Sequence, residues 1–351
     1  MSFDYEQLRR DLSWDTAKRD LGWTDGQAIN IAQVCVDRHA AGGRGDKVAL
    51  VHENHEGVVR RFTYRDLQQL TNGWASFLRG TVLVKPLDRV CLFLDRIPEL
   101  YIGFVGILKT GAVVEPLFSA FGEDALVARM LDSRATAIIT QRRHLGKVRK
   151  ARERLPDLKT VIVVDHEEDG RPLRDGEIAY RMMDRRADAF PVAPTYAETP
   201  SVLHYTSGTT GAPKGAMHVH SSILAQYLTT KVVLDVRDDD VYWCTADPGW
   251  VTGTSYGIIG PWSLGATQVV VDAGFSSDRW YETIEKHRVT VWYTAPTAIR
   301  MLMKDGFEPV RRHDHRSLRH MASVGEPLNP EAVRWGHEAF GLWFHDTFWQ
   351  T

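Results

Sequence analysis

The stretch LHYTSGTTGAPKG, residues 203–215, determines the fold class that we expect for this chain. The apolar run at residues 201–205 predicts a short buried strand, and residues 216–227 predict a helix. Between them lie three glycines, four hydroxyl side chains and one lysine. A strand, a flexible polar loop and a helix in this order are typical of α/β proteins that hold phosphate groups, because small residues let backbone N–H groups approach an anion.

The position of the lysine separates this loop from the common phosphate loop, in which Gly-Lys-Ser/Thr follows a glycine and four further residues. Here Lys214 follows Pro213 and precedes Gly215. An unrelated nucleoside triphosphatase is therefore disfavoured, also because no acidic Mg²⁺ motif stands out. The remaining alternative for a loop of this composition is a plain Gly/Ser/Thr surface turn.

The composition is that of a globular protein with room for more than one subdomain, since 43% of its 351 residues are hydrophobic and 25% are charged. The net charge of −2 argues against a general nucleic-acid binder. Cys35, Cys91 and Cys244 are far apart, which indicates neither a metal site nor a disulfide framework and is typical of a reducing compartment. The polar N-terminus is unlike a secretory signal, and charges interrupt the most apolar region, residues 90–121. We therefore expect a cytoplasmic protein without a membrane span.

Apolar runs predict that strands and helices alternate along most of the chain. Strands are expected at residues 48–52, 58–62, 89–94, 112–114, 135–140, 160–164, 201–205, 241–244, 266–271, 289–293, 320–324 and 342–345. Helices are expected at residues 29–39, from Thr63 onward, and at 98–110, 123–133, 142–154, 216–227, 277–287, 296–304 and 329–340. This alternation indicates parallel sheets covered by helices, with ligands bound at the strand ends.

The same pattern suggests how the chain is divided. Residues 1–27 lack a clean period and are expected to form an arm on the surface of a domain. Two doubly wound α/β subdomains are expected at about residues 28–165 and 200–351. The charged, proline-containing residues 166–199 would connect them.

Three further loops follow predicted strands, where such sheets bind ligands. Residues 245–256, TADPGWVTGTSY, place Trp250 where it could wall a pocket, although a core position is the alternative for a single tryptophan. Residues 323–328, SVGEPL, contain a glycine and a proline that fix a turn able to lie flat against a planar ring. Residues 345–351, HDTFWQT, follow the last strand, so their polar side chains would leave the sheet edge together.

In their order, these loops resemble those of the adenylate-forming enzymes, which comprise acyl-CoA synthetases, luciferases and peptide-synthetase adenylation domains. YTSGTTGAPKG resembles the phosphate loop of that superfamily, and DPGWVTG resembles a string of its acetyl-CoA synthetase branch. Similar strings also occur at residues 109–117, 262–266 and 293–297. The resemblance covers nearly the whole chain and is nearest to the N-terminal part of AMP-forming acetate–CoA ligases. It implies an α/β fold, the large N-terminal domain of the adenylate-forming enzymes with two doubly wound subdomains.

The resemblance implies ATP, Mg²⁺ and coenzyme A as cofactors and co-substrates, with small molecules as partners and neither nucleic acid nor a membrane. ATP or AMP would be bound by Thr206, Ser207, Gly208, Thr209, Thr210, Gly211, Lys214, Gly325, Glu326, Pro327, Asp346, Thr347, Phe348, Trp349, Gln350 and Thr351. The catalytic contacts would come from Lys214, Thr206 and Thr351. The acyl pocket would be lined by Trp250, Val251, Thr252 and Trp349, and Thr252 would also touch CoA.

Trp349 decides which acid we expect, because an indole closing the pocket leaves room for one or two carbons beyond the carboxylate. Activation of acetate or another short-chain acid to acyl-AMP and then acyl-CoA is therefore expected. A ligase for propionate or a longer acid is one alternative, and a nucleotide-binding module without catalysis is another. The reaction requires no nucleophilic side chain, so His204, His218 and His220 are expected to be structural or pocket-lining.

The resemblance also implies parts that would follow Thr351. In relatives the next residue is a glutamate that binds Mg²⁺, so no metal ligand is expected within the chain. We expect an incomplete AMP-binding domain at residues 28–351, truncated before the β-barrel portion, the C-terminal domain and its adenylation lysine. Such a chain would bind ATP or AMP weakly and make little acyl-AMP alone. Arg142, Arg143 and Lys147 form a basic cluster that could meet a CoA phosphate, although a solvated helix face is the favoured explanation.

Overall fold

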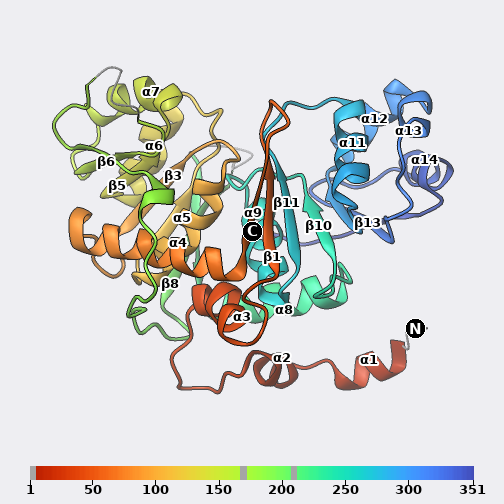
Figure 1. The fold of residues 1–351 in the computed structure, drawn as a ribbon, viewed down its shortest axis with the longest axis horizontal. Coiled ribbons are helices and arrows are strands. Elements are labelled where there is room, and N and C mark those ends of the chain that lie inside the picture. The colour runs from red at the N-terminus through yellow and green to blue at the C-terminus, as the bar shows by residue number, and fades with distance from the viewer. Residues whose placement is uncertain (1–4, 167–171, 207–211) are drawn as a thin grey trace.

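The computed structural model describes residues 5–166, 172–206 and 212–351, which form two seven-stranded sheets flanked by helices (Figure 1). We call them sheet A and sheet B. In spatial order, sheet A contains β14 (Phe344–Asp346), β13 (His320–Ser323), β12 (Val291–Thr294), β10 (Val241–Cys244), β11 (Thr267–Val271), β1 (Val48–Glu53) and β2 (Val59–Thr63). Neighbouring strands are parallel except for the antiparallel pair β1–β2.

Sheet B has the same size and a similar pattern. In spatial order it contains β7 (Glu177–Ala179), β6 (Thr160–Val163), β5 (Ala137–Thr140), β3 (Arg89–Phe93), β4 (Val113–Pro116), β8 (Pro200–Thr206) and β9 (Lys214–Val219). Only its edge pair β8–β9 is antiparallel. The predicted α/β class with two mainly parallel sheets is therefore confirmed.

The chain passes between the sheets more than once. It begins in sheet A with β1 and β2, builds sheet B from β3 to β9, and returns to sheet A from β10 to β14. Relative to the expected subdomains at residues 28–165 and 200–351, each sheet therefore holds two strands from the other half of the chain. This exchange places the pair β8–β9 in sheet B, while the later predicted ligand loops follow strands of sheet A.

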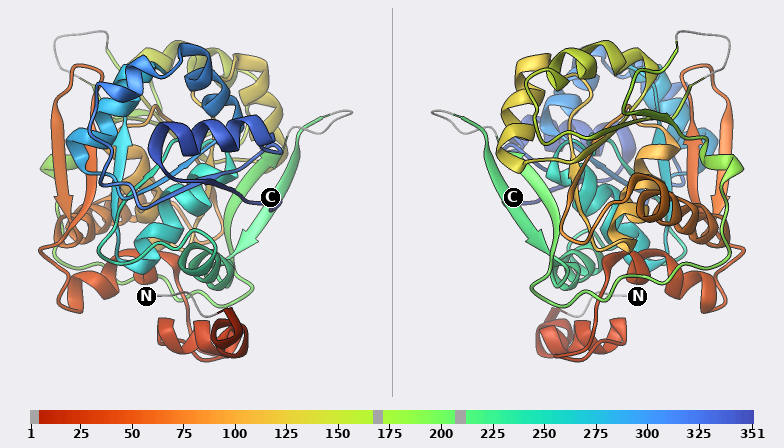
Figure 2. Two further views of the ribbon diagram at one scale, coloured as in Figure 1. Left: turned by 90° about the vertical axis from the view of Figure 1, so that its right-hand side faces the viewer. Right: turned by 90° about the vertical axis from the view of Figure 1, so that its left-hand side faces the viewer.

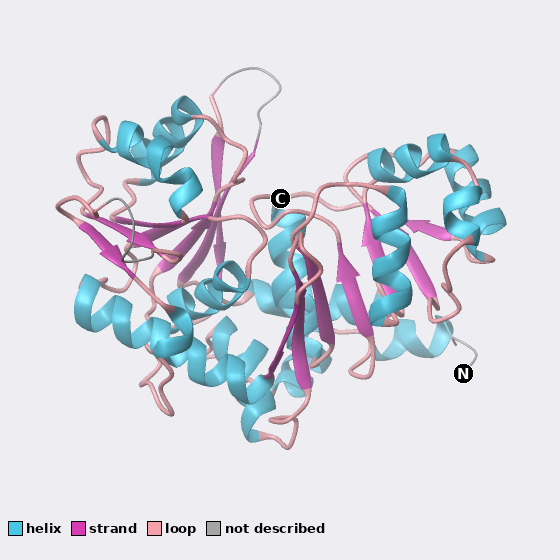
Figure 3. Cartoon of the chain, turned by 45° about the horizontal axis from the view of Figure 1, so that its top comes forward, coloured by secondary structure: helices cyan, strands magenta, loops and turns pink. Residues whose placement is uncertain are grey.

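Helices cover both sheets, as Figure 3 shows by colour. The longer ones are α2 (Trp14–Leu21), α4 (Tyr64–Phe77), α5 (Pro98–Lys109), α6 (Glu123–Ser133), α7 (Arg142–Arg152), α8 (Ser222–Val232), α11 (Ser277–His287), α12 (Pro296–Asp305) and α14 (Pro330–Phe340). The shorter ones are α1 (Tyr5–Asp11), α3 (Arg38–Ala41), α9 (Val251–Thr254), α10 (Gly260–Leu264) and α13 (Glu308–Arg311), together with the π-helices η1 (Gln33–Asp37), η2 (Leu78–Val82) and η4 (Ser255–Ile259) and the 3₁₀ turn η3 (Met182–Asp184). Helices α6 and α11 have the predicted bounds.

Helices α4 and α5 show how the sequence sets local structure and packing. The Thr63 side chain accepts a hydrogen bond from the backbone N–H of Asp66, whose carboxylate accepts one from the Thr63 N–H, so α4 begins with the predicted capping box. Its buried face includes Trp74, which lies against Gly106 of α5. A Cβ at Gly106 would lie 2.4 Å from the Cβ of Trp74, so only glycine permits this approach of the two helices.

The predicted helix at residues 216–227 is wrong in its first half. Residues Lys214–Val219 form β9, which pairs antiparallel with β8, and α8 begins only at Ser222. The apolar residues after Lys214 fit a helical period as well as a strand period, and the free edge of β8 decides in favour of the strand. Figure 2 shows the two strands (green) extending together from the body of the molecule.

The remaining features concern cysteines and membranes. All three cysteine thiols are free, with Cys35 and Cys91 buried and Cys244 partly so. In the ranges given above, no helix is long and apolar enough to cross a membrane.

Candidate active site

A cavity of about 1020 Å³ lies where the C-terminal ends of β8, β10, β12 and β13 meet. Its lining comes from six separate segments of the chain. These residues are His204, Tyr205, Thr206, Thr245, Ala246, Trp250, Val251, Thr252, Phe275, Trp280, Tyr293, Thr294, Ala295, Thr297, Ala298, Met301, Val324, Gly325, Glu326, Trp349, Gln350 and Thr351. Both sheets contribute, since β8 belongs to sheet B and the other three strands belong to sheet A.

The structure brings together most of the predicted site residues that it describes. The cavity is lined by Thr206, Trp250, Val251, Thr252, Gly325, Glu326, Trp349, Gln350 and Thr351. The lining does not include Lys214, Pro327, Asp346, Thr347 or Phe348. The predicted residues Ser207, Gly208, Thr209, Thr210 and Gly211 lie outside the described residues.

The base of the predicted phosphate loop is held by strand pairing. Thr206 lies opposite Lys214 at the end of the β8–β9 ladder, and its hydroxyl is 3.5 Å from the Lys214 carbonyl oxygen. The Lys214 side chain is exposed to solvent and points to no described partner, whereas Thr206 lines the cavity. Of the two residues predicted to contact phosphate, Thr206 is therefore at the cavity, and the Lys214 side chain is not.

The loop after β10 is a tight turn packed against sheet B. The Asp247 carboxylate accepts a hydrogen bond from the Gly249 N–H at 2.8 Å, and the Asp247 carbonyl accepts one from the Trp250 N–H at 2.9 Å. A Cβ at Gly249 would lie 2.4 Å from backbone atoms of Phe118, so glycine is required. Burial raises the pKa of Asp247 to about 6.

Trp250 is a wall of the cavity and does not occupy a core position. Its ring lies 5.9 Å from that of Phe118 and 6.3 Å from that of Phe121, both in the loop that follows β4. It remains 42% exposed, which a core tryptophan would not be. These ring contacts join the two sheets beside the cavity.

The Gly-Glu-Pro turn and the C-terminal string support each other. Asp346 accepts hydrogen bonds from the Ser323 hydroxyl at 2.7 Å and from the Leu328 N–H at 3.0 Å. The Thr347 hydroxyl donates to the Ser323 carbonyl at 2.8 Å. Glu326 is held from the other side by an ion pair with Arg300 of α12. Asp346 and Thr347 therefore fix the position of the turn in this structure, and they do so without lining the cavity.

Trp349 closes one end of the cavity. Its ring meets that of Tyr256 edge to face at 5.0 Å, and it packs with Tyr293 and Val324 in one apolar cluster. Its indole N–H is buried. The adjacent Phe348 side chain is 91% exposed and points away from the cavity.

The histidines near the phosphate loop are uncharged at neutral pH. His204 lines the cavity, is hydrogen-bonded through Nε2 to the Thr254 hydroxyl at 2.6 Å, and has its pKa lowered to about 3 by burial. His220 accepts a hydrogen bond from the Ile31 N–H at 3.2 Å, and burial lowers its pKa to about 4. Burial also lowers the pKa of His218. These positions favour structural and lining roles.

One wall of the cavity was not foreseen from the sequence. It consists of Phe275 and Trp280 at α11 together with Thr297, Ala298 and Met301 of α12. The string at residues 293–297 predicted part of this wall. For an aromatic residue on a helix such as α11, however, the sequence is equally consistent with a position in the hydrophobic core. Only the position of α11 relative to the strands shows that Trp280 reaches the cavity.

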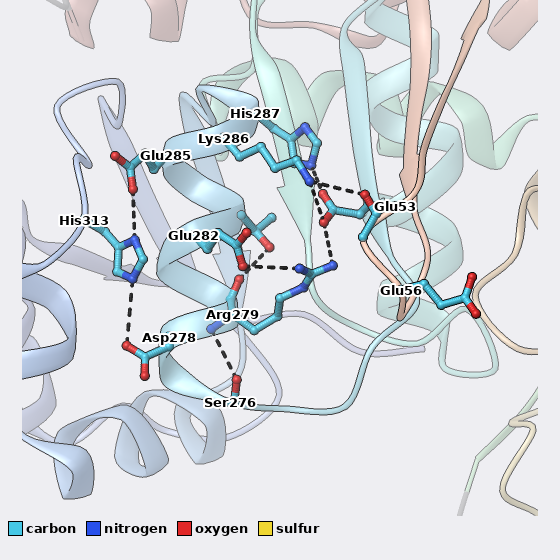
Figure 4. A network of polar contacts seen from close by, with 12 residues as sticks. Glu53, Glu56, Ser276, Asp278, Arg279, Glu282, Glu285, Lys286, His287 and His313 are labelled. Atoms are coloured by element: carbon cyan, nitrogen blue, oxygen red, sulfur yellow. Dashed lines mark hydrogen bonds and ion pairs between the residues drawn. The ribbon is translucent and has the colours of Figure 1, made fainter.

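Helix α11 is anchored by a buried carboxylate (Figure 4). Glu53 of β1 is 1% exposed and forms ion pairs with Arg279, Lys286 and His287, all on α11. Burial acts to raise the pKa of Glu53, but hydrogen bonds from Lys286 and His287 and the charge of Arg279 hold it below its ordinary value. This network fixes the helix that carries Trp280.

The basic cluster on α7 is engaged with neighbouring groups. Arg143 pairs with Asp95 at 2.9 Å, and Lys147 donates to the Phe121 carbonyl at 3.2 Å. The backbone N–H of Arg142 donates to Asp165 at 2.7 Å. The Arg143 and Lys147 side chains, two of the three predicted to meet a CoA phosphate, thus have partners within the chain.

Two α/β sheets that share a cavity at their strand ends define a ligand-binding α/β protein of the doubly wound kind. Comparison with known proteins narrows this class. Residues 36–351 match the model of the family described as AMP-binding enzyme, and the chain belongs to that family.

The relatives agree with this assignment and with the resemblance noted from the sequence. Acetyl-coenzyme A synthetase of Bacillus subtilis is 43% identical over 349 residues, which are 99% of this chain and 60% of that protein. Acetyl-coenzyme A synthetase 2 of Pseudomonas aeruginosa is 37% identical over 375 residues, covering 99% of this chain and 58% of that protein. The crystal structure of a Brucella canis acyl-CoA synthetase matches with a TM-score of 0.90 at 28% identity, covering 99% of this chain and 62% of that one. The chain thus spans about 60% of the length of the curated relatives it matches.

Proposed function

We propose that this chain forms the nucleotide- and acyl-binding part of an enzyme that activates acetate or another short-chain acid with ATP and passes the acyl group to coenzyme A. The observation that carries the proposal is the meeting of Thr206, residues 250–252, residues 325–326 and residues 349–351 in one cavity of about 1020 Å³. The relatives named acetyl-coenzyme A synthetase support the reaction class.

The chemistry explains why such a cavity needs a phosphate grip and an acyl pocket side by side. A carboxylate is a poor acyl donor because its leaving group would be oxide, and joining it to AMP supplies a good leaving group. The carboxylate oxygen must attack the α-phosphate, so two anions have to be held close together and in line. This attack breaks the bond between the α- and β-phosphates and releases pyrophosphate, and Thr206, Thr351 and Lys214 would hold the phosphates during it. In a later step the thiol of CoA would attack the acyl carbon and release AMP.

The adenine would lie on the Gly-Glu-Pro turn. Gly325 adopts a φ of +104°, which a residue with a side chain rarely adopts, so at this position the turn presents a backbone surface without a side chain to the cavity. Asp346 and Thr347 fix this surface from behind through Ser323 and Leu328. A planar ring such as adenine would fit between this turn and the C-terminal string.

The acyl group would lie between Trp250 and Trp349. Both indoles line the cavity with Val251 and Thr252, and Trp349 is held in place by the edge of Tyr256. Two large aromatic side chains leave a short space, which favours acetate over longer acids. Propionate remains the nearest alternative substrate, and Thr252 would face the thiol of CoA.

Mg²⁺ that accompanies a nucleotide is usually held by the phosphates and water, with one or two carboxylates from the protein. No group of three or more His, Cys, Asp or Glu side chains that could hold a metal ion occurs in residues 5–166, 172–206 and 212–351. When bound with ATP, Mg²⁺ neutralises charge on the phosphates. We assign no residue of this chain to it.

Calorimetric titration of the chain with AMP, ATP and a non-hydrolysable acetyl-adenylate tests the proposal. We expect the acetyl-adenylate to bind most tightly, because it occupies the nucleotide and acyl parts together, and Thr206→Val to weaken all three ligands. A matched control is Thr81→Val on η2, an exposed residue that lies outside the cavity lining. If the chain bound AMP and acetyl-adenylate with equal affinity, it would be a nucleotide-binding module without an acyl site.

Turnover is tested separately by acetate-dependent exchange of pyrophosphate into ATP. We expect the 351-residue chain to show weak exchange or none, since it spans about 60% of the relatives' length. Exchange at the rate of a full-length relative would contradict this expectation while leaving the binding proposal intact.

A further inference from the structure

A second cavity of about 430 Å³ lies on a different part of the molecule and shares no lining residue with the active-site cavity. We call it the arm pocket. It is lined by Asp20, Arg38, His39, Arg44, Tyr227, Lys231 and Leu264. These residues come from α2, α3, α8, α10 and the loop before β1, and Figure 1 shows α2, α3 and α8 together on the lower side of the molecule.

The arm pocket lies at the opposite end of sheet A from the active site. Arg44 is in the segment that leads into the start of β1, and Leu264 ends the helix that precedes β11. The active-site residues instead follow the C-terminal ends of their strands. A ligand of the arm pocket would therefore not compete directly with one in the active site.

The side chains that line the arm pocket carry more positive than negative charge. Three cations, Arg38, Arg44 and Lys231, face the single lining carboxylate of Asp20. Among the lining residues of the described chain, Leu264 is the sole aliphatic one. A chain with a net charge of −2 thus concentrates positive charge in one polar hollow, which suits an anion and not an apolar ligand.

Arg38 is the group whose charge remains unmatched. Lys231 pairs with Asp20 at 2.7 Å, and Arg44 pairs with Asp238 at 2.6 Å. Within the described ranges, Arg38 has no carboxylate at ion-pair distance and donates to backbone carbonyls of Ser263 and, at 3.4 Å, of Asp20. Its Nε is buried, and the described chain offers it no hydrogen-bond partner.

Burial and nearby positive charge act together on two groups of the arm pocket. The His39 ring is 2% exposed, and burial, together with the charges of Arg38 and Arg44, lowers its pKa to about 3. Burial also lowers the pKa of Arg38, while Cys35 and Tyr227 act to raise it and Arg44 to lower it. An anion placed among these side chains would relieve the repulsion between the two guanidinium groups.

We propose that the arm pocket binds a phosphate-class dianion, either inorganic phosphate or the phosphoryl group of a small molecule such as pyrophosphate. Guanidinium groups match the tetrahedral oxygens of phosphate in geometry and charge, and Arg38 and Arg44 face the same hollow. Lys231 adds a third donor, held in position by its bonds to Asp20 and Tyr227.

The test uses inorganic phosphate, pyrophosphate and AMP as separate probes, titrated at constant ionic strength with chloride as the compensating ion. We expect phosphate or pyrophosphate to bind the wild-type chain and to raise its melting temperature as mass action requires. The double variant Arg44→Gln/Lys231→Gln should weaken that anion by about a hundredfold, about tenfold for each of the two charge-assisted hydrogen bonds lost. The tighter of the two inorganic anions identifies the source of the phosphoryl group.

Two controls separate this site from the active-site cavity. Arg65→Gln removes an exposed cation that pairs with Asp46 and lies outside the arm pocket, so it should leave anion binding unchanged. The double variant should also retain wild-type affinity for AMP, which shows that it is folded. Should it fail to fold, Lys231→Gln alone should still weaken the anion, because that side chain is 47% exposed and its loss is well tolerated.

The proposal is overturned if neither inorganic anion binds the wild-type chain. It is also overturned if the anion effect persists in the double variant and disappears in Thr206→Val, because the anion would then bind at the active-site hairpin.

Discussion

The Ser323 hydroxyl donates a 2.7 Å hydrogen bond to the carboxylate of Asp346, and through it the last residue of β13 holds the last residue of β14. The other oxygen of Asp346 accepts from the N–H of Leu328 at 3.0 Å. One side chain therefore sets the position of the Gly-Glu-Pro turn relative to the C-terminal string. Asp346 was predicted to contact the nucleotide, and the structure adds a supporting task behind the turn.

Replacing Asp346 tests this supporting task. Asp346→Ala removes both hydrogen bonds, so the turn and the string should lose their fixed spacing, and the affinity for AMP should fall by about tenfold, equivalent to about 1.4 kcal/mol. Calorimetric titration with AMP measures the change. Glu338→Ala, an exposed acidic residue on α14, is the matched control and should bind AMP as the wild type does.

Gly249→Ala tests the packing of the loop that carries Trp250. The new Cβ would lie 2.4 Å from the Phe118 backbone, which cannot move aside as a side chain can, so the loop must shift. We expect weaker binding of acetyl-adenylate, although no lining side chain has been removed. Gly274→Ala is the control, because a Cβ there meets no atom within 4 Å. Equal loss of affinity in both variants would contradict the assigned packing.

Trp349→Gly tests the length of the acyl pocket. Removing the indole opens the end of the cavity, so binding of a butyryl-adenylate analogue should improve relative to the acetyl analogue by about tenfold or more, the effect of one or two methylene groups. Competitive titration of the two analogues gives the ratio. Trp343→Gly removes a tryptophan that stacks on His337 outside the cavity and should leave the ratio unchanged. An unchanged ratio in Trp349→Gly would place the acyl group elsewhere.

Glu53→Ala tests the network that anchors α11. It leaves Arg279, Lys286 and His287 without their shared buried partner, and we expect a loss of about 3 kcal/mol in the free energy of unfolding, the low end for breaking a buried ion pair. Urea unfolding at pH 7 measures it. Glu282→Ala, which removes a more exposed partner of Arg279, should cost less than about 1 kcal/mol. Similar losses of unfolding free energy in the two variants would contradict the anchoring role proposed for Glu53.

The buried histidines predict loss of stability in mild acid. Burial lowers the pKa of His204 and His39 to about 3, and that of His52, His220 and His320 to about 4. Because the folded pKa is below the ordinary value of 6.5, the unfolded chain binds more protons below that value, and stability falls as the pH falls. Each such histidine contributes a slope of up to about 1.4 kcal/mol per pH unit well below its unfolded pKa. Urea unfolding at pH 7 and pH 5 checks this, and equal free energies would contradict it.

The sequence by itself determined what depends on neighbouring residues. The capping box at Thr63 and Asp66 marked the start of α4, because both partners lie within one helical turn. The bounds of α6 and α11 followed from helical periodicity and their flanking residues. The positions of the four predicted loops also came from the sequence, since each is a dense local string after an apolar strand, and Thr206, Trp250, Gly325 and Trp349 from these strings line one cavity.

The tertiary structure decided what depends on distant partners. Residues Lys214–Val219 are a strand because β8 offers them a free edge, and β1 and β2 join sheet A because β11 lies beside β1. Trp280 reaches the cavity because Glu53 holds α11 from a strand more than two hundred residues away in the chain. Local periodicity records which side of a helix or strand is apolar, but the identity of the surface that covers it is a long-range contact that no single segment contains.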